Sequence, residues 1–245
     1  MLEKVSRNVF MWTEPQRGEE PTVRGEGSRL LMPILALVLP CVYVLLIGPR
    51  LSASSIGPVY STLIGIAVMW LITGGIAFWV VRVEKRSLTS VGLKRLSPMM
   101  ALQSFGIGVL LVLSVPLLQI LARSVIPSGE AGSAEALAAR SPWWLLLLSV
   151  VTAGVTEEFL YRGYPLERLL EWNGSKWVSS LIALAFFALA HAGGWNLAHI
   201  VGVVIPLGAA LTALYWWRRN LVFVMIAHTV VDLPIVFLAL ATQGG

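Results

Sequence analysis

The sequence predicts an all-α polytopic membrane protein with about seven transmembrane helices in one bundle. Of its 245 residues 57% are hydrophobic and only 13% are charged, and the mean hydropathy of +0.79 is too high for a soluble domain. The apolar residues also gather in runs of about twenty, the length that crosses roughly 30 Å of hydrocarbon. The single cysteine, Cys41, lies inside the first run, which excludes an intrachain disulfide and a site built from several thiolates.

A polar tail, residues 1–29, precedes one transmembrane domain, residues 30–245, and no repeat or second domain is evident. An Asn-Gly turn at 173–174 predicts that the fourth and fifth helices form an antiparallel hairpin. The pair Gly74-Gly75 favours a close helix contact in the second span. We expect spans at 30–48, 56–81, 99–122, 177–193, 197–217 and 221–241. A fourth helix opens at Trp143, crosses the membrane and runs on amphipathically to Glu171.

The basic residues predict the orientation of the chain in the membrane. With a cytosolic amino terminus, only Arg50, Arg123 and Arg140 of the 18 lysines and arginines lie on the outer side. The net charge of +5 and the pI of 9.7 therefore reflect loops beside the spans, and we expect no nucleic-acid partner. The chain begins without the features of a removable signal peptide. We expect an integral protein of a prokaryotic plasma membrane, with the lipid bilayer as its surroundings.

Ionisable side chains inside the predicted spans are confined to the last four helices. Each costs a few kcal/mol in hydrocarbon unless it faces protein or water, so such a cluster indicates a functional site. The first three spans carry none and are expected to pack and shield. The ionisable residues within the spans are Glu157, Glu158 and Arg162 on the fourth, His191 on the fifth, His199 on the sixth, and His228 and Asp232 on the seventh.

Helical spacing predicts which of these side chains meet. Glu158 and Arg162 are four residues apart and can pair, whereas Glu157 points about 100° away. Glu157 precedes the hairpin turn by nearly the same number of residues as His191 follows it. We therefore expect the two residues to lie at the same depth in the membrane. His228 lies nearer its own cytosolic turn than His191, so their levels agree only if the hairpin tip projects roughly 12 Å into the cytosol.

A carboxylate that faces two histidines can activate water for hydrolysis. The carboxylate acts as general base, one histidine positions the water, and a second can donate to an oxyanion. A zinc site would use the same residue types. The helical motif His-Glu-x-x-His is absent, however, so zinc ligands would have to come from three helices.

Three short motifs, each on its own predicted helix, resemble those of the CAAX protease and bacteriocin-processing family (CPBP, or Abi). The resemblance covers roughly residues 142–241, the expected catalytic portion, and builds the site from helices four, five and seven. The motifs are Glu157-Glu158-x-x-x-Arg162, Phe187-x-x-x-His191 and His228-x-x-x-Asp232.

The resemblance implies an intramembrane endopeptidase that cleaves membrane-associated or lipidated (CAAX-type) proteins or peptides. The resemblance implies that Glu157 is the general base and that His191 holds the same water. It places His228 and Asp232 at the oxyanion. The supporting residues would be Glu158, Arg162 and Phe187. An ionised aspartate cannot donate to an oxyanion, so we expect Asp232 to act by orienting His228.

The family is also described as metalloproteases, although the sequence requires no cofactor. If zinc is used, its ligands would be Glu157, His191 and His228. Two other classes stay open on the residues alone. Intramembrane carboxylates and histidines relay protons in proton-coupled transporters, and a non-catalytic relative could bind a partner as an immunity or scaffold protein.

Overall fold

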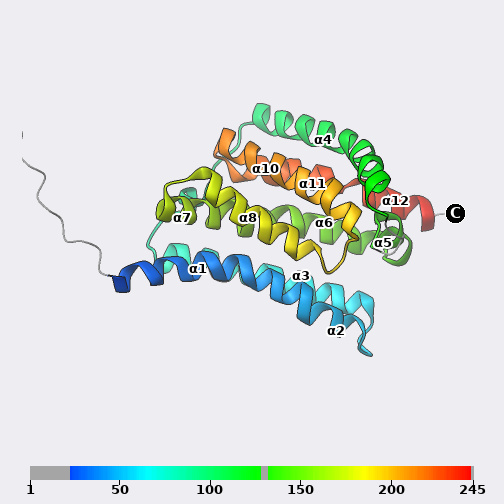
Figure 1. Cartoon of the computed structure of the whole chain (residues 1–245), viewed down its shortest axis with the longest axis horizontal. Helices are drawn as coiled ribbons and strands as arrows, with labels where there is room; N and C mark the ends of the chain where they lie inside the picture. The colour runs from blue at the N-terminus through cyan, green and yellow to red at the C-terminus, as the bar shows by residue number, and fades with distance from the viewer. Residues whose placement is uncertain (1–22, 128–131, 244–245) are drawn as a thin grey trace, which may run out of the picture.

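The computed structural model describes residues 23–127 and 132–243, and these residues form helices joined by short loops (Figure 1). Helix α1 begins at Val23, so the helix of the first span starts before residue 30. Residues 1–22 of the predicted tail lie outside the described residues. The elements of the first half are α1 (Val23–Val42), the π-helix η1 (Tyr43–Ile47), α2 (Gly48–Ser52), α3 (Pro58–Arg82), the 3-10 helix η2 (Leu88–Val91) and α4 (Pro98–Val125).

The second half of the chain contributes the remaining helices of the same bundle. They are α5 (Ala134–Arg140), α6 (Trp143–Glu157), the π-helix η3 (Glu158–Gly163), α7 (Tyr164–Asn173), α8 (Lys176–His191), α9 (Leu197–His199), the π-helix η4 (Ile200–Val204), α10 (Ile205–Arg218), α11 (Leu221–Asp232) and α12 (Pro234–Gln243).

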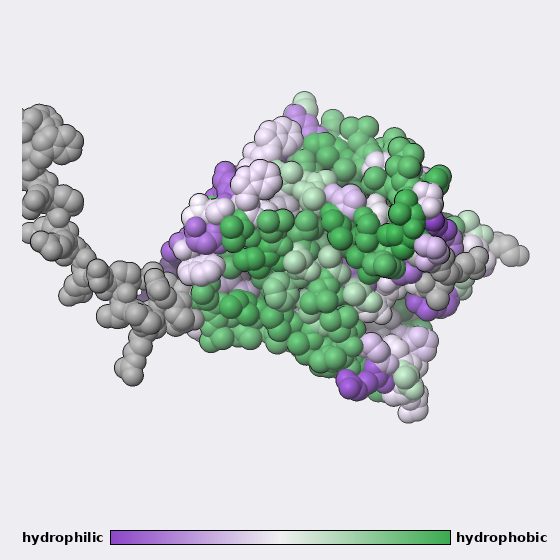
Figure 2. Space-filling model, in the orientation of Figure 1, coloured by the Kyte–Doolittle hydropathy of each residue, from purple (hydrophilic) through white to green (hydrophobic). Residues whose placement is uncertain are grey.

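Six helical segments of the described chain are long and apolar enough to cross a membrane. The predicted fifth helix, α8, is apolar but has only 16 residues. With α8 the bundle agrees with the expectation of about seven helices. Figure 2 shows an apolar band across the visible face of these helices, with polar residues gathered toward the two ends of the long axis. The chain is an integral membrane protein.

Polar caps mark where the apolar runs begin. Ser97, Ser175 and Asn220 each accept a hydrogen bond from a backbone N–H of the first turn, at the starts of α4, α8 and α11. Such a side chain replaces a partner that the first turn of a helix lacks. The Asn173-Gly174 turn forms as predicted, with Gly174 at a φ of 68°, and it reverses the chain between α7 and α8.

The second half of the chain supplies most of the interior, although α1 and α3 also contribute buried residues such as Leu37 and Val80. In the most apolar stretch of α4 only 6% of the residues are buried within the protein, against 50% in the corresponding stretches of 143–173 and 221–243. Helix α4 therefore presents most of its surface to lipid. Close contacts hold α11 against its neighbours, because a Cβ at Gly154 of α6 would overlap the Thr229 side chain. The prediction for Gly74-Gly75 was wrong, since nothing lies within 4 Å of a Cβ at either position.

Each of the three π-helices in the described chain ends two residues before a proline: Pro49, Pro165 and Pro206. A proline has no N–H, and its ring clashes with the carbonyl four residues earlier. Widening the preceding turn to a π-helix relieves that clash, and such turns are frequent at functional sites. In η3 the widened turn begins at Glu158 and directly follows Glu157, so Pro165 shapes the turn next to the Glu157 position.

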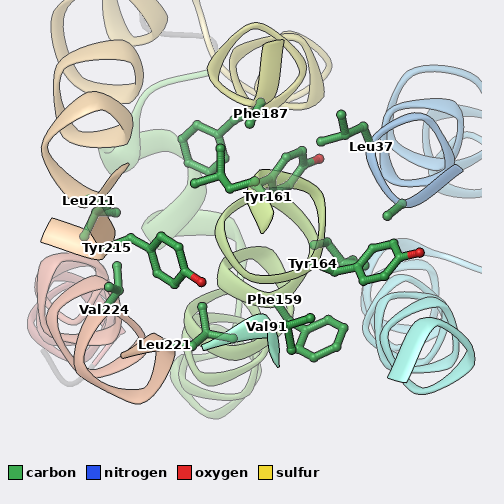
Figure 3. Packing of buried hydrophobic residues seen from close by; sticks show 14 of the residues in the cluster. Leu37, Val91, Phe159, Tyr161, Tyr164, Phe187, Leu211, Tyr215, Leu221 and Val224 are labelled. Carbon is green, nitrogen blue, oxygen red and sulfur yellow. The ribbon is translucent and has the colours of Figure 1, made fainter. Parts of the chain in front are cut away.

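The tip of the hairpin is held by charged pairs with the connector between α3 and α4. Glu84 accepts hydrogen bonds from Arg168 at 2.9 and 2.6 Å and from the Tyr164 hydroxyl at 2.8 Å. Glu167 similarly accepts from Arg219 at 2.8 Å and from the Tyr215 hydroxyl. Charge-assisted bonds of this kind are strong and directional. They satisfy the polar residues of α7, and Figure 3 shows the aromatic residues packed around this helix.

Candidate active site

Glu157 and His191 face each other across the α6–α8 pair, as the residue count along the hairpin predicted. Their Oε2 and Nε2 atoms are 3.9 Å apart, and each side chain is 19% exposed. The His191 Nδ1 atom lies 2.7 Å from the Phe187 carbonyl oxygen. Because that oxygen only accepts, Nδ1 donates to it, and in the neutral imidazole Nε2 then carries the lone pair.

The gap between Glu157 and His191 suits a donor that bridges two acceptors. Oε2 of Glu157 is buried and has no hydrogen-bond partner. A carboxylate oxygen and an imidazole lone pair cannot hydrogen-bond to each other, but one water can donate to both. The pair therefore forms a place where a water can be held and deprotonated.

Glu158 points to the opposite side and joins two basic groups. Its Oε1 atom accepts from Arg162 Nη1 at 2.9 Å, the predicted pair, and lies 2.7 Å from His228 Nδ1. The contact with His228 was not foreseen. It shows that α11 lies beside the end of α6 at the depth of the two glutamates. This is the depth expected for His228 if the hairpin tip projects into the cytosol. Glu158 and Arg162 are almost fully buried, at 0% and 1% exposed.

His228 lies between two carboxylates. Its Nδ1 atom faces Glu158, and its Nε2 atom is 3.4 Å from Asp232 Oδ2, one helical turn further along α11. The arrangement agrees with the expectation that Asp232 orients the ring. Asp232 is 35% exposed whereas His228 is 6% exposed, so Asp232 forms the outer member of the chain Glu158–His228–Asp232.

Arg162 and Phe187 tie the site to the surrounding helices. Arg162 donates to the Gly208 carbonyl at 3.2 Å, and its guanidinium lies 4.0 Å from the centre of the Phe187 ring. The same ring is 4.5 Å from the His191 ring. Gly208 leaves room for this stack, since a Cβ there would come within 3.0 Å of Phe187.

A cavity of about 380 Å³ brings four of the predicted residues together. Glu157, His191, His228 and Asp232 all line it, with Phe187 in the wall as expected. Most other lining side chains are aliphatic and come from α4, α5, α6, α10 and α12. Glu158 and Arg162 do not line the cavity, so their place behind the reactive groups agrees with a supporting role.

Tyr161 and His199 are residues that the motifs did not assign. Tyr161 is 1% exposed, its hydroxyl has no hydrogen-bond partner, and it lines a second cavity of about 200 Å³ together with Glu157 and His191. The Cys41 thiol is a polar neighbour of that hydroxyl. His199 lines the larger cavity and stacks on Trp195 at 4.1 Å between ring centres. The spacing of Tyr161, four residues after Glu157, was the available signal.

The side chains named as zinc ligands do not converge on one point. Both ring nitrogens of His228 face carboxylates that accept hydrogens from them, so neither presents a lone pair for a metal ion shared with Glu157 and His191. Among the described residues, no group of three histidine, cysteine, aspartate or glutamate side chains could hold a metal ion. The donor geometry of the described chain therefore does not fit a zinc site of this composition.

Comparison with known proteins agrees with the three motifs. Searches of curated proteins and of solved structures found no match to this chain. Residues 139–234, which carry all seven motif residues, match the family model described as type II CAAX prenyl endopeptidase Rce1-like, which confirms the predicted resemblance to the CAAX proteases.

Proposed function

We propose that this protein is an intramembrane endopeptidase that hydrolyses peptide bonds of membrane-associated proteins or peptides. The observation that carries the proposal is the Glu157–His191 pair. Two acceptors lie 3.9 Å apart, and both face a cavity inside a helical membrane bundle. The family match of residues 139–234 supports a protease over a proton-coupled transporter, and the filled motif positions support a catalyst over a silent scaffold.

In the proposed reaction Glu157 acts as the general base and His191 holds the attacking water. The water donates one hydrogen to each acceptor. As its oxygen attacks the peptide carbonyl carbon, the Glu157 carboxylate takes the proton, and the carbonyl oxygen becomes an oxyanion. When the C–N bond breaks, Glu157 returns that proton to the leaving amine. The buried Oε2 atom of Glu157 is suited to this step because nothing else competes for it.

His228 stabilises the oxyanion in this scheme. The ring lines the cavity, and Glu158 accepts from the Nδ1 hydrogen. The Nε2 hydrogen, which faces Asp232 Oδ2, is then shared with the oxyanion. A donor held in place beforehand costs no reorganisation when charge develops on the substrate. Asp232, at 3.4 Å from Nε2, orients the ring.

The substrate class follows from the surroundings of the site. A reactive centre enclosed by transmembrane helices and aliphatic side chains accepts an apolar or lipid-anchored segment more readily than a soluble one. The description of the matched family points to CAAX-type lipidated tails as one such class.

A comparison of membrane proteomes tests the proposal. Cells with the wild-type protein should contain new protein termini near membrane anchors that are missing in cells with the Glu157→Gln variant. The matched control is Glu135→Gln, because Glu135 is an exposed carboxylate on α5 and should leave the termini unchanged. Identical termini in wild-type and Glu157→Gln cells, at equal levels of membrane-inserted protein, would refute the assignment.

A further inference from the structure

The larger cavity lies on one side of the reactive residues along the bundle. The larger cavity is lined on α6 only by residues up to Glu157, on α8 only from Phe187 onward and on α11 only from His228 onward. On α4 its lining begins at Val112, and on α10 it ends at Leu211. Every one of these stretches runs toward the end of the molecule that carries α5 and α12 (Figure 1).

The smaller cavity extends toward the same end. Besides Glu157 and Tyr161 it is lined by Pro40 and Val44, around the end of α1 in the middle of the first span, and by Trp195 in the loop after α8. Neither lining includes a residue of the connector between α3 and α4. We call the end with α5 the cavity end and the end with the connector the packed end.

Side chains fill the space between the reactive residues and the packed end. Leu160, Tyr164, Leu166 and Tyr215 are each at most 1% exposed, and Arg162 lies among them at 1%. Beyond them, the Glu84–Arg168 and Glu167–Arg219 pairs close the surface. Because these side chains are fully buried and close-packed, they leave no route for a peptide. Substrate therefore cannot reach the reactive residues through the packed end unless that end unfolds.

The basic residues identify which side of the membrane each end faces. The cavity end carries Arg50, Arg123 and Arg140, and the packed end carries many more. The basic residues of the packed end within the described chain include Arg24, Arg29, Arg82, Lys85, Arg86, Lys94, Arg95, Arg168, Lys176, Arg218 and Arg219. Cytosolic loops hold the excess of lysine and arginine in membrane proteins, so the packed end is the cytosolic one.

We propose that substrate reaches this site from the non-cytosolic half of the bilayer. This inference rests on the proposed function and narrows its substrate class to exported or membrane-anchored polypeptides whose cleaved bond lies in the outer half of the membrane. An apolar side chain or an acyl chain beside that bond would occupy the aliphatic wall formed by α4, α5 and α12. A tail that is prenylated in the cytosol would meet the packed end instead.

Thiol labelling in right-side-out membrane vesicles tests the direction of access without needing a substrate. Cys41 is buried, so the wild-type chain serves as the unreactive blank. Three single variants report three places: Ser54→Cys in the exposed loop of the cavity end, Ser87→Cys in the exposed connector, and Ser149→Cys in the cavity wall. The probe is a membrane-impermeant methanethiosulfonate with a trimethylammonium group, and the readout is the mass of the purified chain.

The expected result is labelling of the Ser54→Cys and Ser149→Cys variants in sealed vesicles, and of the Ser87→Cys variant only after permeabilisation. Labelling of Ser87→Cys but not Ser54→Cys in sealed vesicles would overturn the orientation. Labelling of Ser149→Cys only after permeabilisation, or only after denaturation, would overturn outward access.

The position of the cleavage sites gives a second readout. New termini that depend on Glu157 should map to the non-cytosolic side of their substrates, and termini on the cytosolic side would refute the inference while supporting the protease. If no termini depend on Glu157, the proposed function fails, whereas the labelling result still decides how the cavity is reached.

Discussion

Glu158 and His228 are 70 residues apart in the sequence, and Oε1 of the first lies 2.7 Å from Nδ1 of the second. The contact divides the paired glutamates between two tasks. Glu158 holds Arg162 and His228 together inside the bundle, whereas Glu157 has a free carboxylate oxygen at the cavity. The two neighbours should therefore respond differently to the same substitution.

The Glu158→Gln variant should be strongly destabilised. The substitution removes the counter-charge of Arg162, which is 1% exposed, and breaking a buried ion pair on one side costs about 3–5 kcal/mol. Thermal unfolding of the purified protein in detergent measures the effect. Glu157→Gln is the matched control and should unfold within a few degrees of the wild type, because its Oε2 atom makes no hydrogen bond. Equal stability of all three proteins would contradict this division.

Substituting Gly154 should disturb the contact between α6 and α11. A Cβ at this position would overlap the Thr229 Oγ1 atom, and overpacking of this kind costs about 1–3 kcal/mol. The Gly154→Ala variant should therefore unfold at a lower temperature. Adding Thr229→Ala removes the overlapping oxygen and should restore part of the loss. A double variant no more stable than Gly154→Ala would show that another contact is responsible.

Pro165 should matter for catalysis through the π-helix that it follows. An alanine there supplies an N–H for the Tyr161 carbonyl, so the turn can tighten to an α-helix and move Glu157 relative to His191. A displacement of about 1 Å can lower a rate roughly 100-fold. The Pro165→Ala variant should lose most of its cleavage rate while remaining folded. Pro33→Ala, in α1 and outside both cavities, is the control; equal rates in all three proteins would argue against the role of the π-helix.

Much of the arrangement could be predicted from the sequence, because apolar runs locate membrane helices and spacing locates faces. The level of Glu157 and His191 followed from counting residues on both sides of one turn. The Glu158–His228 contact could not be counted in this way, since α6 and α11 share no turn and their relative depth depends on packing. The π-helix at Glu158–Gly163 was missed although Pro165 signalled it, and Gly74-Gly75 misled because a glycine pair also occurs on a lipid-facing surface.

Activity should not depend on zinc. His228 is engaged by Glu158 and Asp232, so a zinc ion at Glu157 and His191 would have only two protein ligands, fewer than zinc enzymes use. Purified protein should contain well under one zinc per chain by elemental analysis and keep its cleavage rate after treatment with a chelator. Loss of activity on chelation, with recovery on adding zinc, would contradict the geometry described for His228.

The most direct test of the central claim is the rate at which the purified protein, reconstituted in lipid, cleaves a peptide identified from the proteome comparison. If Glu157 is the general base, the Glu157→Gln variant keeps the shape and fold of the site but loses the proton acceptor, and the rate should fall by about 10²–10⁴-fold. The Glu135→Gln control should cleave at the wild-type rate. A Glu157→Gln variant that cleaves within a few-fold of the wild type would show that the water is activated by another group.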